Sequence, residues 1–342
     1  MTVVDEPVEL PPETAPADLP ITARGFSSVE EAERVAYTVG YTVRLISRLI
    51  DLERLAGITI ATDYTDGLAS VDRGYPNAKT PTATSSSEIV GAAMSVNVLR
   101  DGVVKAHLVF AADMMLPLLD SNSPYTALAL SLVAHECGHV ADLKHRDEKF
   151  PGTILQNKYN GYYQQMIYPL ADILWEEYAA CRISAVFSDK ETPRFEESLV
   201  SVSGVAQERS KAAIRAYRLH GNLNRVLAKA GNALCEPLRM MAYLRGQLDG
   251  LGQDLDQAPA ARTLLACSAY GAISDQLTLA LRDLWERRAG WASPAEFEPL
   301  RKLCVDTFAL GGIFLTPAPD GNVYVHIPFT PGTMPGEGAA RE

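Results

Sequence analysis

The sequence predicts an α+β protein in which a small antiparallel or mixed sheet precedes a mostly helical C-terminal region. Two β-rich runs, 89–99 and 103–110, are joined at Arg100-Asp101-Gly102, and Asp-Gly between such runs is typical of a tight hairpin. Apolar residues at helical spacing then fill most of 123–146 and of 192–288. The sheet is therefore expected early in the chain and the helices after it.

The N-terminal part is expected to begin with one long helix. Ser28 can cap this helix, and Glu31 three positions later completes a capping box. Apolar residues at helical spacing predict that the helix runs to about Leu55 and stops near Gly57. A short strand at 57–61 and a loop at 72–87, which is rich in Gly, Pro, Ser and Thr, should follow.

Composition divides the chain into four predicted parts. Proline-rich ends at 1–27 and 330–342 are expected to be disordered tails. Residues 28–188 should form the core that carries the chemistry, and 189–329 a helical region. Within that region, helices are expected over 192–230, 232–251 and 260–288.

Charge and cysteine content exclude several classes of protein. The 342 residues carry a formal net charge of −11 without clustered Lys and Arg, which argues against a nucleic-acid partner. The 5 cysteines contain no CxxC pair and are expected to be reduced thiols. There is no secretion signal and no apolar run of about 18 residues, so a soluble, cytoplasmic protein without a membrane partner is expected.

The chemistry is concentrated in the motif His135-Glu136-Cys137-Gly138-His139. On a helix the two imidazoles lie four residues apart on one face, where both can bind one zinc ion, with Glu136 beside them. The flanking residues 132–134 and 140–141 are apolar. Three ionisable groups in an apolar helix need a partner such as a metal, because burying them uncompensated is costly. The helix should start at Ser123-Pro124 and end at 143–146.

A catalytic zinc ion needs a third protein ligand, and Glu177 is the favoured candidate. It lies in a helix that Pro169 could open, on a face made of Leu, Ile, Ala, Cys and Ser. HExxH followed about forty residues later by Glu-Tyr-x-Ala resembles the gluzincins among the zincin metallopeptidases, especially the compact prenyl-protease-like and phage-repressor-cleaving branches. The resemblance covers about 89–188 and implies a zincin-like core with Zn²⁺ held by His135, His139 and Glu177.

Some features leave other assignments open. His145 has the spacing of a metzincin third ligand, although Asp142 stands where that family has glycine. The prenyl-protease-like pattern has Asp where this chain has Cys181. Glu176 is a weaker ligand candidate because its face is less apolar. Asp142 could accept a hydrogen bond from a ligand imidazole, or be a charged residue of the last helical turns.

The expected function is hydrolysis of a protein or peptide by a zinc-activated water, with Glu136 as general base. The group that stabilises the transition state stays open among the following residues: Tyr163, Tyr168, Tyr178 and Arg182. Cys137 and Cys181 could form a redox-sensing pair, but small core residues are favoured. The alternative is a zinc-containing regulatory or interaction protein without catalysis. The sequence specifies neither the substrate nor the oligomeric state.

Overall fold

The computed structural model describes residues 10–76, 78–83, 91–156 and 158–335. The chain forms two compact units, and the main boundary falls between Glu148 and Lys149. The boundary that the sequence suggested, after residue 188, lies 40 residues further along the chain than this one. In the structure the HExxH motif belongs to the first unit, whereas Glu177 belongs to the second. No helix in the described ranges is long and apolar enough to cross a membrane.

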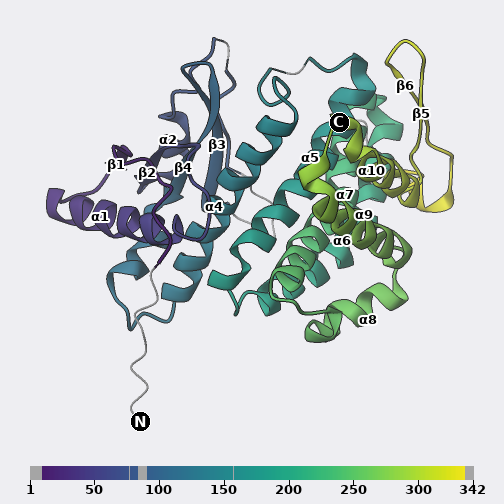
Figure 1. Cartoon of the computed structure of the whole chain (residues 1–342). Coiled ribbons are helices and arrows are strands. Elements are labelled where there is room, and N and C mark those ends of the chain that lie inside the picture. Colours follow the sequence, from purple (N-terminus) through teal and green to yellow (C-terminus); the bar gives the residue numbers. More distant parts are fainter. Residues whose placement is uncertain (1–9, 77, 84–90, 157, 336–342) are drawn as a thin grey trace. The chain divides into compact units, whose positions relative to one another are not determined.

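A four-stranded mixed sheet forms the centre of the first unit (Figure 1). β1 and β2 are parallel, as are β2 and β4, whereas β3 pairs antiparallel with β4. The spatial order β1-β2-β4-β3 makes β3 an edge strand. The strand bounds are β1 (Ile21–Arg24), β2 (Leu55–Ala61), β3 (Ala93–Arg100) and β4 (Val103–Ala111). Together with the mostly helical second unit, this sheet confirms the predicted α+β class.

The hairpin between β3 and β4 is confirmed in its type as well as its place. Arg100 pairs with Val103, so the loop has only two residues. Asp101 (φ 52°) and Gly102 (φ 76°) both adopt positive φ angles, as a type I′ turn requires. Aspartate tolerates this conformation better than most residues, and glycine adopts it freely. Residues 89 and 90 of the predicted strand lie outside the described residues.

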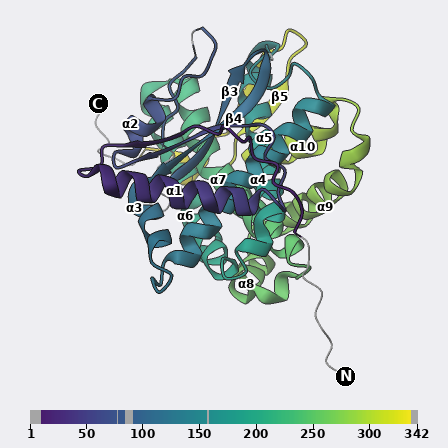
Figure 2. The same ribbon diagram turned by 60° about the vertical axis from the view of Figure 1, so that its left-hand side comes forward.

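Helices cover both faces of this sheet. Gly40 of α1 (Val29–Ile46) lies so close to Ile21 that a Cβ there would be 2.4 Å from the Ile21 side chain. Gly67 of α2 (Tyr64–Ala69) makes a similar approach to Ala61 and Val109, which point to the opposite face. Figure 2 shows α1 running across the strands. Ser28 caps α1 by accepting a hydrogen bond from the N–H of Glu31, as predicted.

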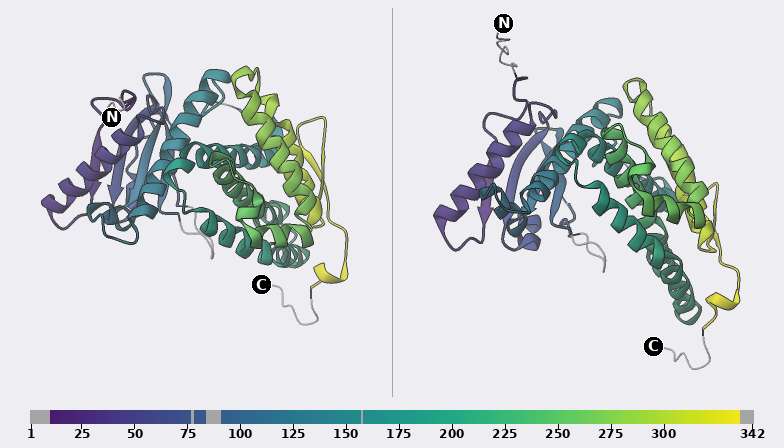
Figure 3. Two further views of the ribbon diagram at one scale, coloured as in Figure 1. Left: turned by 60° about the horizontal axis from the view of Figure 1, so that its bottom comes forward. Right: turned by 90° about the horizontal axis from the view of Figure 1, so that it is seen from below.

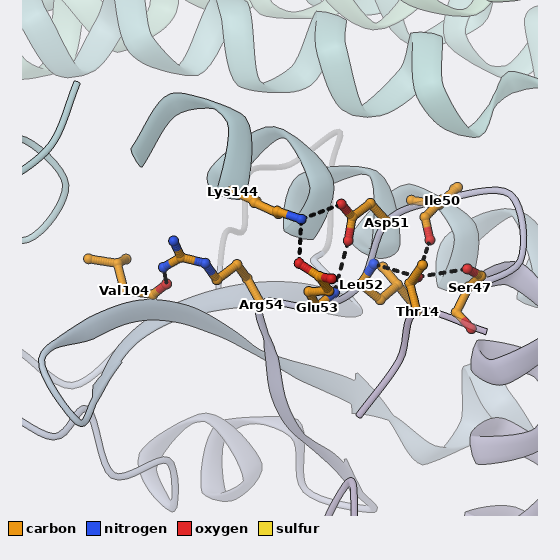
Figure 4. A network of polar contacts seen from close by, with 9 residues as sticks. All are labelled: Thr14, Ser47, Ile50, Asp51, Leu52, Glu53, Arg54, Val104 and Lys144. Carbon is orange, nitrogen blue, oxygen red and sulfur yellow. Dashed lines mark hydrogen bonds and ion pairs between the residues drawn. The ribbon is translucent and has the colours of Figure 1, made fainter. Parts of the chain in front are cut away.

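The prediction that the first helix reaches Leu55 is wrong, because Thr14 holds the chain in a turn after Ile46. The Thr14 hydroxyl donates to Ser47 O (2.7 Å) and accepts from Leu52 N (3.0 Å), so these groups are satisfied outside a helix (Figure 4). The chain is thereby turned into β2, which contains the strand predicted at 57–61.

The prediction of disordered tails is wrong for the parts that the structure describes. Ala15 and Leu19 are buried, and β1 pairs with β2. Near the other end, Thr333 is buried and Arg215 donates to Gly332 O (2.9 Å). Residues 1–9 and 336–342 of the predicted tails lie outside the described residues.

The motif helix, α4, spans Thr126–Lys149 and follows the short helix α3 (Ala112–Met115). It starts two residues after the predicted Ser123-Pro124, because Ser123 forms a turn in which its carbonyl accepts from Thr126 N. Its C-terminal part is held by Lys144, which forms ion pairs with Asp51 (2.6 Å) and Glu53 (2.5 Å) (Figure 4). These contacts fix the helix in the first unit.

The second unit is a helical assembly with a terminal hairpin, shown by the teal, green and yellow ribbons of Figures 1 and 3. Helix α7 packs closely against both α5 and α6. The helices are α5 (Gly161–Ser184), α6 (Thr192–His220), α7 (Leu223–Gly250), α8 (Pro259–Cys267), α9 (Gly271–Arg287) and α10 (Glu298–Leu310), and the strands are β5 (Phe314–Pro317) and β6 (Val323–His326).

Three helix boundaries in this unit differ from the prediction. Pro169 lies inside α5, which starts eight residues earlier at Gly161. Gly221 (φ 66°) ends α6 in a left-handed conformation, and Asn222 caps α7, so the predicted helix over 192–230 is two helices. The predicted helix over 260–288 divides into α8 and α9. The break between α6 and α7 is thus set by two residues, Gly221 and Asn222, within an otherwise periodic pattern.

A half-buried histidine in β4, His107, makes the stability of the first unit depend on pH. Burial, with a smaller effect of the Arg100 charge, lowers the pKa of His107 to about 4, and its Nε2 lies 2.8 Å from Thr59 Oγ1. The folded-state pKa lies below the unfolded value of about 6.5. The unfolded chain therefore binds more protons between pH 6.5 and 4, and the free energy of unfolding falls as the pH falls through this window.

We expect His107 to contribute about 3 kcal/mol to this loss. Urea unfolding at pH 7 and at pH 4.5, followed by hydrogen exchange of peptides from β4, measures it. His107→Gln should lose less stability on acidification than the wild type, whereas the exposed His326→Gln serves as the matched control and should behave like the wild type. Equal acid sensitivity of His107→Gln and the wild type would contradict this assignment.

Candidate metal centre

His135 and His139 lie one turn apart on α4 and face each other. Their Nε2 atoms are 3.1 Å apart, and their ring planes make an angle of 86°. Two nitrogen ligands of one tetrahedral zinc ion, each about 2.0–2.1 Å from the metal, lie about 3.3 Å apart. The observed separation therefore fits two imidazoles that share one zinc ion.

Glu136 lies between these histidines in the sequence, and only 5% of its surface is exposed. Its neighbour Cys137 is fully buried. Burial, followed by the charge of Glu136, raises the pKa of the Cys137 thiol far above its ordinary value. The thiol therefore stays protonated and unreactive, which agrees with a small core residue rather than a redox sensor.

Tyr64 is a polar residue near the motif that the sequence analysis missed. It is the first residue of α2, and its hydroxyl oxygen is buried without a hydrogen-bond partner among the described residues. Burial, followed by the charge of Glu136, raises the pKa of Tyr64. The hydroxyl therefore stays protonated and can donate a hydrogen bond. It also interacts electrostatically with Glu136. The sequence offered one signal for this helix, namely Asp63, whose side chain caps α2. The helix itself has only six residues, which are too few to show a helical periodicity of apolar residues.

Asp142 forms an ion pair with Arg146 one turn further along α4. The Arg146 Nε donates to Asp142 Oδ2 at 2.8 Å, and both residues are buried. Buried ion pairs with a direct hydrogen bond hold their partners in fixed rotamers. This contact fits a charged residue in the last turns of the helix, and a hydrogen bond from a ligand imidazole to Asp142 stays a prediction.

His145 does not fit the ion that His135 and His139 could share. Helix α4 continues without a break to Lys149, so Asp142 does not turn the chain as the metzincin glycine does. With a rise of 1.5 Å per residue, His145 lies about 9 Å beyond His139 along the helix axis. The metzincin-like alternative is therefore excluded for this conformation of α4.

Glu177 is buried in the second unit, with 7% of its surface exposed. It lies on α5 next to the fully buried Tyr178, whereas Glu176 is half-buried. Tyr243 of α7 interacts electrostatically with the Glu177 carboxylate. Burial, followed by the charge of Glu177, raises the pKa of Tyr243 far above its ordinary value, so its hydroxyl stays protonated.

Two of the candidate transition-state donors belong to another network. The Tyr178 hydroxyl donates to Asp249 Oδ2 (2.7 Å) and also accepts from Arg182. Arg282 forms a bidentate contact with the same Asp249. Tyr178 and Arg182 therefore tie α5, α7 and α9 together. Of the other two, Tyr168 stacks under the Arg301 guanidinium at 3.7 Å, and Tyr163 is half-buried.

Comparison with known proteins places the chain in no family. No protein-family model matches it, and neither a curated protein nor a solved structure does.

Proposed function

We propose that this chain is a zinc-dependent metallopeptidase with a zincin-like core, in which His135, His139 and Glu177 bind the metal and Glu136 is the general base. The observation that carries the proposal is the 3.1 Å separation of the two imidazole Nε2 atoms on either side of a buried glutamate. Each of the three proposed ligands offers one donor atom. Two imidazoles and one carboxylate are a ligand set of catalytic zinc sites that leave a position open.

Glu136 and Tyr64 have separate roles in the proposed reaction. A bound zinc ion supplies a Lewis acid that polarises a carbonyl group and acidifies water. Glu136 accepts a proton from the attacking water and delivers it to the leaving amine, which requires a carboxylate that does not itself bind the metal. Tyr64 is the best-supported donor for the charge that develops on the substrate, since its buried hydroxyl has no partner in the described part of the chain.

The edge strand β3 suits an extended peptide substrate. Arg73 O accepts from Leu99 N (2.9 Å), and Arg73 Nε donates to Asn97 O (2.6 Å), so the odd-numbered residues direct their backbone groups away from β4, and Arg73 occupies those of Asn97 and Leu99. Ser95 lies two residues before Asn97 and has the same orientation. Peptides commonly bind such edges by adding a strand. A protein or peptide is therefore the proposed substrate.

Hydrolysis of an unfolded protein by the zinc-loaded chain tests this function. Unfolded casein is a suitable first substrate, because it offers many extended segments. New amino termini should appear with the wild type and be nearly absent with Glu136→Gln. Zinc-loaded wild type that produces no new termini from any of a set of unfolded proteins would contradict the proposal.

A further inference from the structure

One arginine of the second unit is buried without a partner for its charge. Arg245 of α7 has only 8% of its surface exposed. Its guanidinium forms no hydrogen bond or ion pair with any residue that the structure describes. Taking an ionised group out of water without a partner is costly, so buried charges are normally paired. The position of Arg245 therefore suits a bound anion.

Two further arginines meet on a carboxylate that lies one turn after Arg245. Asp249 Oδ1 accepts from Arg282 Nε (3.0 Å) and Nη2 (2.6 Å), and Arg182 Nη1 lies 3.7 Å from Asp249 Oδ2. Residues four apart on a helix share one face, so Arg245 lies on the same side of α7 as Asp249. Burial, followed by the charge of Arg282, lowers the pKa of Arg245, which agrees with this proximity.

The close crossing of α5 and α7 brings these residues together. A Cβ on Gly246 would lie 2.4 Å from Tyr178 O, and one on Gly250 would lie 2.5 Å from Arg182 O. Only glycine allows backbone to approach backbone in this way. Asp249 lies between these two glycines in the sequence, so its side chain reaches Tyr178 and Arg182 of α5 directly.

Asp249 cannot neutralise all three guanidinium groups. A carboxylate offers about four acceptor sites, and hydrogen bonds from α5 and α9 occupy those of Asp249. Two other acids, Asp254 and Asp275, interact with Arg245 electrostatically but form no ion pair with it. Three positive charges and one negative charge leave two positive charges in excess where α5, α7 and α9 meet.

A phosphate group matches this cluster in charge and in geometry. It carries about −1.5 to −2 charges at neutral pH, and guanidinium groups bind its oxygens through pairs of parallel hydrogen bonds. The cluster is open to solvent, since the side chains of Arg282 and Arg182 are 42% and 23% exposed. We propose that Arg182, Arg245 and Arg282 bind a phosphate group, as inorganic phosphate or on a small phosphomonoester. The site includes none of the proposed zinc ligands, so it does not rest on the zinc assignment.

Isothermal titration calorimetry of the full chain tests this site with inorganic phosphate, glycerol 3-phosphate and acetate. Whichever phosphate binds the wild type more tightly shows whether the site takes the free ion or an ester. Acetate should bind at least about tenfold more weakly, because it carries only one charge. In Arg245→Gln, phosphate affinity should fall about 10–100-fold through the loss of charged hydrogen bonds. Arg225→Gln is the matched control, since it changes an exposed arginine of the same helix and should bind like the wild type.

Urea unfolding provides a second readout. Arg245→Met removes the unpaired charge and keeps an apolar stem, so without phosphate this variant should be at least as stable as the wild type. Added phosphate should stabilise the wild type and Arg225→Gln but not Arg245→Met.

Several results would overturn the inference. One is a wild type that binds neither phosphate compound, and another is acetate that binds as tightly as phosphate. Wild-type phosphate affinity in Arg245→Gln would place the anion elsewhere, for example on a zinc ion. A marked loss of stability in Arg245→Met would show that the chain itself already provides a partner for Arg245.

Discussion

Glu136→Gln is expected to retain one zinc ion and to hydrolyse unfolded protein about 10²–10⁴-fold more slowly than the wild type. Glutamine has nearly the same shape as glutamate but cannot accept the proton of the attacking water. Because Glu136 is not one of the proposed ligands, metal binding should be unchanged. The initial rate at which new amino termini appear, measured on zinc-loaded protein, gives the size of the effect.

The matched control is Glu148→Gln, which changes an exposed glutamate of the same helix and should keep full activity. If Glu136→Gln bound zinc and cleaved as fast as the wild type, Glu136 would not be the general base. If the wild type bound zinc but cleaved nothing, the alternative of a zinc-containing regulatory protein would be favoured.

Gly246→Ala is expected to destabilise the second unit by about 2 kcal/mol or more. The new Cβ would lie 2.4 Å from Tyr178 O and 2.8 Å from Cys181 Cβ, so α7 would have to move away from α5. This cost exceeds the gain of roughly 1 kcal/mol that alanine brings to a helix interior. All three tryptophans, Trp175, Trp285 and Trp291, lie in this unit, so their fluorescence during urea unfolding measures its stability.

Gly204→Ala provides the comparison for this effect. Gly204 lies inside α6, and a Cβ built on it meets no atom within 4 Å. Alanine there should stabilise the unit by about 0.5–1 kcal/mol, because only the helix-propensity gain remains. Equal effects of the two substitutions would show that the α5–α7 crossing does not require glycine at position 246.

Features that depend on neighbouring residues could be predicted from the sequence. The helix that carries His135 and His139 follows from local apolar periodicity, and the β3–β4 turn follows from Asp101-Gly102. The early end of α1 could not be predicted in the same way. It depends on Thr14, which lies 33 residues from its partner Ser47 in the sequence and looked like part of a proline-rich tail.

In the candidate site, too, only the features that depend on neighbouring residues could be predicted from the sequence. His135, Glu136 and His139 form a short motif, so their arrangement follows from one turn of helix. Tyr64 comes from another element, and no spacing in the sequence relates it to the motif. Its position depends on how α2 lies on the sheet. Tertiary packing of this kind leaves no periodic signal in the sequence.

The zinc content of purified protein tests the central claim most directly. We expect one zinc ion per chain in the wild type and in His145→Ala, and almost none in Glu177→Ala, with circular dichroism confirming that both variants fold. Mass spectrometry with an inductively coupled plasma gives the metal-to-protein ratio. Zinc retained at wild-type level in Glu177→Ala, or no zinc in reconstituted wild type, would contradict the proposed metal centre.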